Sequence, residues 1–189
     1  MASDSSTPEP SLGLQGKLLL ADPSLRDGIF SRSVVLLAEH SPTEGALGLI
    51  LNQDTGKTVG DLLPQQDQFF PLRHLAVHDG GPVARDQLTF SAFWWSRKQG
   101  LRWSLRLSAA EAQLHAQRPG RIVRAFIGYS GWTPGQLENE IHHHSWIQTP
   151  AAADLLGRDH DRSLWAALLR SISPLHQILA AAPDDPTLN

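Results

Sequence analysis

The sequence predicts an α+β fold dominated by antiparallel strands, and three observations support this fold class. Residues 101–107 alternate between apolar and polar side chains, which is typical of a strand with one buried face. Residues 33–40 and 46–52 are two apolar runs separated by a short turn-rich segment, which favours a hairpin. Helical patterns are few and do not alternate regularly with strands, so the βαβ repeat of a parallel sheet is not indicated.

Composition restricts the class of protein. The chain has 189 residues, 41% of them hydrophobic, and we expect one domain over residues 13–180. The formal net charge of -3 provides no overall positive field for binding nucleic acid or an acidic membrane. The absence of cysteine excludes disulfides, thiolate nucleophiles and cysteine-bound zinc.

Both ends are predicted to be disordered tails. Residues 1–12 are rich in serine, proline and acidic residues, and residues 181–189 contain two prolines and a pair of aspartates. The first of these segments lacks the basic and apolar regions of a secretory signal, and no apolar run reaches the ~20 residues of a membrane span. We therefore expect a cytoplasmic protein that does not insert into a membrane.

Residues 16–63 are predicted to form three strands and one short helix. Residues 16–21 form an apolar strand, and residues 33–40 are apolar on both faces, which indicates a central strand. Residues 46–52 complete the hairpin. Residues 58–63, which precede Pro64, indicate a short capped helix.

The middle of the chain continues the antiparallel pattern. Residues 75–78 form a strand that ends at an Asp-Gly-Gly-Pro turn, and residues 88–95 form another before the alternating strand 101–107. Ser108 and Glu111 form a capping box that begins a helix, and this helix must end before Pro119.

Residues 121–138 indicate a strand, a glycine-rich bend and a helix in succession. Residues 121–127 are rich in β-branched side chains and are followed by Gly128 and Gly131, which favour a bend. Thr133 resembles an N-cap whose partner is Gln136. Leu137 and Ile141 then form the apolar stripe of the helix, whereas Glu138, Asn139 and Glu140 are expected to face water. Residues 145–148 predict a short strand, and residues 163–170 predict a helix that ends at Pro174.

Four ordered blocks resemble the YqgE/AlgH family of bacterial proteins. These blocks are residues 30–40, 45–52, 80–83 and 128–138. The resemblance implies an α+β fold in which the sheet is folded into a barrel-like body. It implies no established molecular activity, although one member of the family is regarded as a transcriptional regulator of alginate synthesis.

The candidate binding surface combines residues from these blocks. Its members are Phe30, Ser31, Arg32, Glu39, His40, Asn52, Gly80, Gly81, Pro82, Tyr129, Gly131, Trp132, Gln136 and Glu138. Polar groups at the ends of adjacent strands can meet in a cleft, although Arg32 and Glu39 can equally form an ordinary ion pair.

No catalytic or metal-binding residues are predicted. Ser130 lies at a strand end, but the nucleophile-elbow motif needs glycine where this chain has Trp132, and the family usually has alanine at the serine position. The three histidines 142–144 cannot converge on one ion from a regular helix, so we interpret them as a solvated helix end. We expect no cofactor.

The leading hypothesis is therefore a non-catalytic binding or regulatory protein whose partner is another protein or a small anion. The alternative is an anion binder or an enzyme that uses the bend from Gly128 to Gln136, with Glu39, His40 or Glu138 as acid or base. Nucleic-acid binding through the arginines and aromatics of residues 85–124 is a third, less favoured reading, because residues that cluster in sequence need not share a face.

Overall fold

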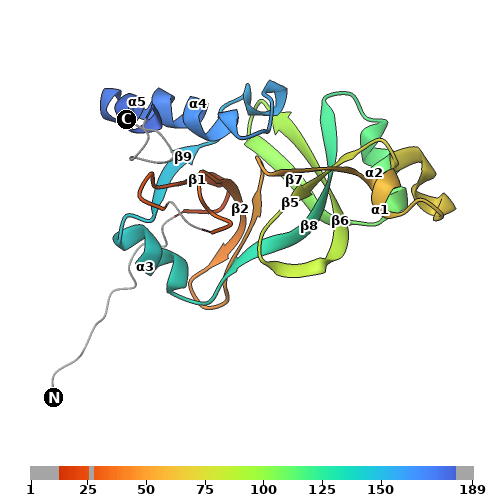
Figure 1. Ribbon diagram of the computed structural model, residues 1–189, viewed down its shortest axis with the longest axis horizontal. Helices are drawn as coiled ribbons and strands as arrows, with labels where there is room; N and C mark the ends of the chain where they lie inside the picture. The colour runs from red at the N-terminus through yellow and green to blue at the C-terminus, as the bar shows by residue number, and fades with distance from the viewer. Residues whose placement is uncertain (1–12, 26–27, 182–189) are drawn as a thin grey trace, which may run out of the picture.

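The computed structural model describes residues 13–25 and 28–181, in which strands and short helices alternate irregularly (Figure 1). The strands are β1 (Lys17–Ala21), β2 (Val34–Ser41), β3 (Gly45–Ile50), β4 (Asp54–Thr58), β5 (Ala76–Asp79), β6 (Val83–Ser96), β7 (Gly100–Leu107), β8 (Arg121–Trp132) and β9 (Trp146–Pro150). The α-helices are α1 (Val59–Leu62), α2 (Ala109–Ala116), α3 (Gln136–His142), α4 (Ser163–Ile172) and α5 (Pro174–Ala180), and the 3₁₀ helices are η1 (Asp67–Leu72) and η2 (Leu155–Gly157). The α+β class is confirmed.

Strand β8 joins two parts of one mixed, mostly antiparallel sheet. The strand order is β4-β5-β8-β3-β2-β1-β9, and β6 pairs with both β7 and β8. The first part of β8 pairs antiparallel with β6 and parallel with β5, whereas residues 130–132 pair with β3. Figure 1 shows the consequence: β8 runs from the lobe of β5, β6 and β7 toward the lobe of β1, β2, β3 and β9.

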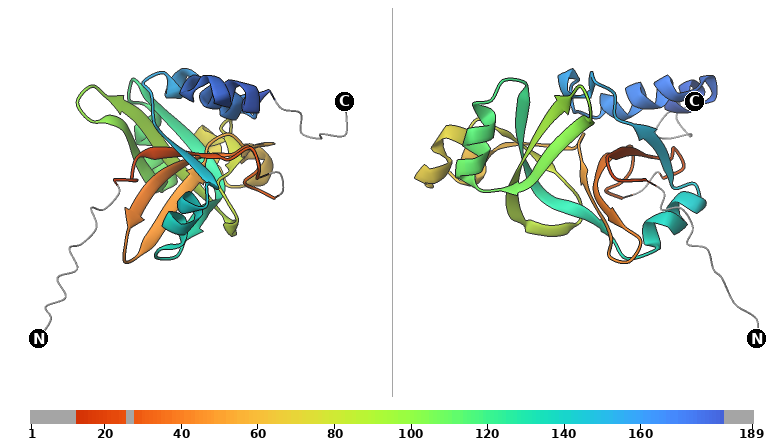
Figure 2. Two further views of the ribbon diagram at one scale, coloured as in Figure 1. Left: turned by 90° about the vertical axis from the view of Figure 1, so that its left-hand side faces the viewer. Right: turned by 180° about the vertical axis from the view of Figure 1, so that it is seen from behind.

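The expected barrel-like body is wrong, because the sheet is not closed. Among the described residues, β4 and β9 each pair with a single strand, so both ends of the strand order remain open. The physical reason is the division of β8. Its first residues pair with β5 and β6 and its last residues pair with β3, so the sheet divides into two lobes at β8 instead of curling back on itself. The view from behind in Figure 2 (right) shows the two lobes side by side.

Each lobe is covered by different helices. Alternate residues of β1 and β2 point to opposite faces: Leu36 packs in a cluster with Trp165 of α4, whereas Val35 packs in a cluster with Leu137 of α3. Helices α1 and α2 cover the other lobe, where Val59 and Ala112 are fully buried. Strand β2 is therefore buried on both faces, as its sequence predicts.

Most predicted elements are confirmed, and the differences are one strand end, one helix cap and three features that were not predicted. The hairpin β2–β3 and the capping boxes of α1 and α2 are present. The predicted end of the strand at Gly128 is wrong, since β8 continues to Trp132, although Gly128 does adopt the positive φ (69°) expected of a bend. Helix α3 is capped by Gly135 in a left-handed conformation (φ 76°) and not by Thr133. Strand β4, helix α5 and the parallel β5–β8 pairing were not predicted. The predicted tails lie outside the described residues, except Ala181, which is the C-cap of α5.

None of the helices in the described part of the chain is long and apolar enough to cross a membrane.

Candidate functional site

Nine of the fourteen predicted site residues line two hollows on the surface, and Phe30, Gly80, Gly81, Pro82 and Glu138 line neither. The first, which we call the hairpin hollow, lies beside the β2–β3 turn, has a volume of about 630 Å³, and contains Glu39, His40, Tyr129, Gly131, Trp132 and Gln136 among its lining residues. The second, which we call the Arg32 hollow, has a volume of about 820 Å³ and contains Ser31, Arg32 and Asn52. Arg32 precedes β2 and Glu39 lies near its end, so the two side chains belong to different hollows and do not form the alternative ion pair.

At the hairpin hollow, His40 is joined to α3. His40 Nε2 lies 2.6 Å from Glu138 Oε1, and the side chain of His40 is 6% exposed. The two residues are separated by 98 positions, so this contact fixes the end of β2 against the first turn of α3. The contact brings the block of residues 30–40 together with the block of residues 128–138.

Glu140 organises the wall behind the hollow. Its Oε2 accepts hydrogen bonds of 2.8 Å from the indole Nε1 atoms of both Trp132 and Trp146, and its Oε1 accepts one of 2.9 Å from Gln136 Nε2. Phe30 packs against both indole rings, with ring centroids 6.4 Å from Trp132 and 5.4 Å from Trp146. The prediction that Glu140 faces water is therefore wrong.

The Gly-Gly-Pro turn supports β8 and does not form a hollow of its own. The φ of Gly81 is 145°, and a Cβ on this residue would overlap the backbone of Tyr129. The carbonyl of Gly80 accepts hydrogen bonds from the Ile50 amide (3.0 Å) and the Ser130 hydroxyl (3.1 Å). Ser130 is completely buried, so its hydroxyl serves this contact and is not presented as a nucleophile. Pro82 is exposed.

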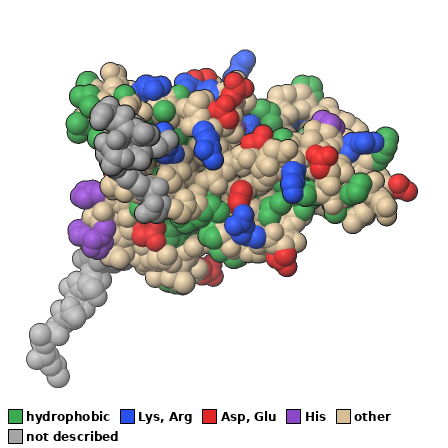
Figure 3. Space-filling view, in the orientation of Figure 1, with side chains coloured by type: hydrophobic (Ala, Val, Ile, Leu, Met, Phe, Trp, Pro, Cys, Tyr) green, Lys and Arg blue, Asp and Glu red, His purple; other side chains and the backbone are tan. Residues whose placement is uncertain are grey.

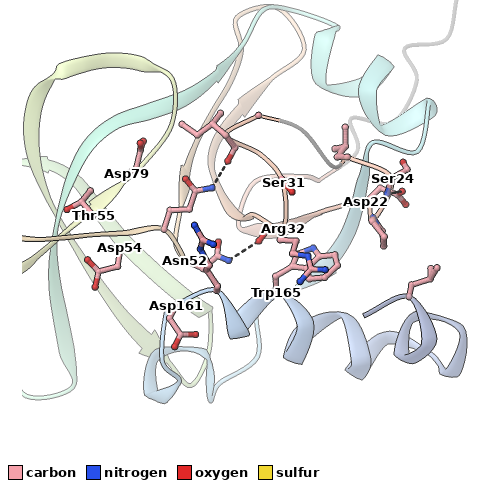
Figure 4. A pocket seen from close by; sticks show the side chains of 17 residues that line it. Asp22, Ser24, Ser31, Arg32, Asn52, Asp54, Thr55, Asp79, Asp161 and Trp165 are labelled. Atoms are coloured by element: carbon pink, nitrogen blue, oxygen red, sulfur yellow. Dashed lines mark hydrogen bonds between the residues drawn. The ribbon is translucent and has the colours of Figure 1, made fainter. Parts of the chain in front are cut away.

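The Arg32 hollow has a mixed polar lining, shown in Figure 4. The Arg32 guanidinium lies 5.3 Å from the centre of the Trp165 ring, and Asn52 Nδ2 donates a 2.9 Å hydrogen bond to the Arg32 carbonyl. Asn52 Oδ1 accepts another from the Val34 amide, so Asn52 ties the segment before β2 to the end of β3. The carboxylates of Asp54, Asp79 and Asp161 also line this hollow (Figure 4).

Histidines 142–144 lie at the end of α3 and are exposed. Figure 3 shows a group of histidine side chains at this end of the molecule. In residues 13–25 and 28–181, no group of three histidine, cysteine, aspartate or glutamate side chains is placed to hold a metal ion.

The basic segment 85–124 is distributed over several environments. Arg85 pairs with Asp79 at 2.6 Å, Arg121 stacks on Trp94 at 4.2 Å from the ring centre, and Arg124 has a buried Nη1 atom. Phe90 and Phe93 are core residues, each 3% exposed. Figure 3 shows basic side chains interspersed with acidic ones on the face in view. These positions offer no row of stacked aromatics along a basic groove.

Sequence reasoning overlooked several residues that build these sites. Trp146, Trp165 and Glu140 were assigned to ordinary elements, because their partners come from remote segments. The sequence offers one signal for such residues: a tryptophan in a core needs a hydrogen-bond acceptor for its indole N–H group, and a nearby glutamate can supply it. Three tryptophans satisfy that need here, two through Glu140 and one through the Ala21 carbonyl.

Comparison with known proteins places these features in context. A family model described as AlgH-like matches residues 18–176. A UPF0301 protein from Cytophaga hutchinsonii is 36% identical, and the alignment covers 93% of this chain and 98% of the relative; one from Streptomyces coelicolor is 35% identical, with 93% and 95% covered. The solution structure of AlgH from Pseudomonas aeruginosa aligns with a TM-score of 0.63 at 27% identity over 97% of this chain and 99% of that one. The crystal structure of DIP2367 from Corynebacterium diphtheriae shares the fold, with a TM-score of 0.65 at 21% identity over 89% and 92% of the two chains.

Proposed function

We propose a function from the premise that the chain belongs to the AlgH-like family, for which the match over residues 18–176 is the evidence. In this proposal the chain is a non-catalytic cytoplasmic binding protein, and the hairpin hollow receives a segment of a partner protein. Any regulatory effect, including one on transcription, would then act through that partner.

The observation that carries the proposal is that the ionisable groups behind the hollow are held by hydrogen bonds to neighbouring side chains. His40 is held by Glu138, and Glu140 is held by two indoles and an amide. These contacts fix the side chains that form the wall of the hollow. A rigid, preformed wall favours binding, because little side-chain entropy is lost when a partner docks.

The rim of the hollow indicates the chemistry of the partner segment. Val83, which is 37% exposed, and Pro134 offer apolar surface next to Tyr129. The exposed carboxylates of Glu39 and Glu44 stand at the edge of the same hollow. This combination suits a segment with an apolar anchor flanked by lysine or arginine, since the anchor is desolvated and the charges attract at the rim.

A charge placed in the hollow is expected to abolish partner binding. Val83→Asp puts a carboxylate on the apolar wall, and Glu44→Lys reverses a rim charge. We expect each to reduce the amount of a specific co-purifying protein at least tenfold, which corresponds to about 1.4 kcal/mol. The measurement is quantitative mass spectrometry after cross-linking in the native host, followed by titration of the recovered partner.

The matched control is Leu114→Asp, which puts the same charge on an apolar residue that is 59% exposed on α2, outside the hollow. All three variants should unfold within about 0.5 kcal/mol of the unmodified chain, because the changes are made at the surface. Equal recovery of the partner by Val83→Asp and Leu114→Asp would show that the hollow is not the binding surface.

A further inference from the structure

A third cavity, which we call the inner recess, lies where β5 and β8 face the segment before α4. Its volume is about 400 Å³. Strands β5 and β8 form its floor, and the segment between η2 and α4 forms a wall. Its lining residues are Asp54, Ala76, His78, Ile122, Val123, Arg124, Arg158, Asp159, His160 and Asp161.

Three buried nitrogen atoms of this lining lack hydrogen-bond partners within the described residues. They are His78 Nδ1, Arg124 Nη1 and His160 Nδ1. The two histidines are 7% and 9% exposed. A buried polar group without a partner is unfavourable, so three of them around one cavity indicate that something else normally satisfies them.

Arg124 is the charged residue on the floor of the recess, whereas three aspartates lie on its exposed rim. Arg124 forms no ion pair with any carboxylate of the described residues. The three aspartates of the lining are exposed, and two of them are engaged elsewhere: Asp161 accepts from the amide and hydroxyl of Ser163, and Asp54 accepts from the Gly56 amide. Arg158, also on the wall, pairs with Asp154. The aspartates keep their charges, so the lining as a whole is not positive, but a ligand atom beside Arg124 Nη1 must be a hydrogen-bond acceptor.

The histidines restrict which anion fits. Burial, reinforced by the positive charge of Arg124, lowers the pKa of His160 to about 4, and burial and Arg124 also lower the pKa of His78, against a smaller opposing effect of Asp54. Both imidazoles are thus neutral at pH 7. His160 Nε2 is 2.8 Å from the Leu155 carbonyl and must be its N–H donor, which leaves Nδ1 as an acceptor.

A ligand must therefore accept from Arg124 and donate to His160. A carboxylate or a sulfate has no proton to donate at neutral pH, whereas a monoanionic phosphate has both acceptor oxygens and a hydroxyl. We propose that the inner recess binds a phosphate group in its singly protonated, monoanionic form, with Arg124 Nη1 as donor and His160 Nδ1 as acceptor. The group is either free phosphate or the end of a phosphomonoester, and this site is separate from the hairpin hollow.

The test is calorimetric titration of the full chain with inorganic phosphate, glycerol phosphate and sulfate at several pH values. We expect phosphate to bind at least tenfold more tightly than sulfate at pH 6. Well above the second pKa of the ligand, which is near 6 for phosphomonoesters, the free ligand is a dianion. Because we propose that the monoanion binds, one proton must then be taken up on binding, and the affinity should fall about tenfold per pH unit. Comparable binding of glycerol phosphate would identify a phosphomonoester site, and binding of inorganic phosphate alone would identify a free-phosphate site.

Two variants separate a binding role from a structural one. Arg124→Met should reduce phosphate affinity more than tenfold without destabilising the ligand-free chain, since it removes an unpaired buried charge. Arg158→Met removes a wall arginine that is already paired and should change affinity less than threefold. Absence of phosphate binding, or equal affinity for sulfate, would overturn the proposal, and so would equal effects of the two variants.

Discussion

Replacing Trp165 with alanine is expected to lower the free energy of unfolding by about 3–5 kcal/mol, the range for deleting a large buried aromatic side chain. Trp165 is 1% exposed and packs in the cluster formed by β1, β2 and α4. Its indole Nε1 also donates a 2.8 Å hydrogen bond to the Ala21 carbonyl, 144 residues away. The substitution therefore removes both the packing and the bond that fix α4 to the sheet. Urea unfolding monitored by circular dichroism would measure the effect.

Two further substitutions separate these contributions. Trp165→Phe keeps most of the ring volume but leaves the Ala21 carbonyl without its donor, and we expect a smaller loss of about 1–3 kcal/mol. Ile178→Ala on α5 removes an apolar side chain that is 72% exposed and should change stability by less than about 0.5 kcal/mol. A loss below about 1 kcal/mol for Trp165→Ala would contradict the docking of α4 seen here.

Local sequence patterns correctly predicted the elements that are stabilised by contacts between residues close in sequence. The β2–β3 hairpin depends on two apolar runs and a short loop, and the capping box of α2 depends on Ser108 and Glu111, three residues apart. Each of these signals is complete within a dozen residues. The family resemblance added the order of the blocks, which the His40–Glu138 contact joins in space.

The glycines of β8 show why the predicted end of the strand was wrong, although Gly128 has the positive φ (69°) expected there. Gly128 and Gly131 were interpreted as residues that permit a turn, but both lie inside a strand. A Cβ at Gly128 would overlap the carbonyl oxygen of Gly81, so the glycine is required by a close approach of two backbones. That approach comes from a segment almost fifty positions away and leaves no periodic signal around Gly128.

The candidate site was predicted only in part, because its geometry also depends on contacts between segments that are remote in sequence. Its polar residues were recognised, but their division into two hollows depends on the direction of β2, which places Arg32 and Glu39 apart. The inner recess was not predicted, because His78, Arg124 and His160 come from three separate elements and none belongs to a local motif.

Replacing Glu140 with leucine is expected to lower the free energy of unfolding by about 3 kcal/mol. A hydrogen bond to an ionised group contributes about 1.5–3 kcal/mol, and Glu140 accepts two from indoles that are only 5–6% exposed. Without the carboxylate, the N–H groups of Trp132 and Trp146 stay buried and unpaired. The same urea titration would measure the loss.

The matched control is Glu138→Leu, which removes the same charge from the same helix but only one hydrogen-bonded partner, His40. Because Glu138 is one-third exposed, we expect a loss below about 1 kcal/mol. The indole N–H signals in a ¹H–¹⁵N spectrum report on the mechanism: Glu140→Leu should shift those of Trp132 and Trp146 and leave that of Trp165 unchanged. If the two variants were equally stable, the carboxylate would be a surface charge, and the wall of the hairpin hollow would be fixed by the packing of Phe30 against the two indoles alone.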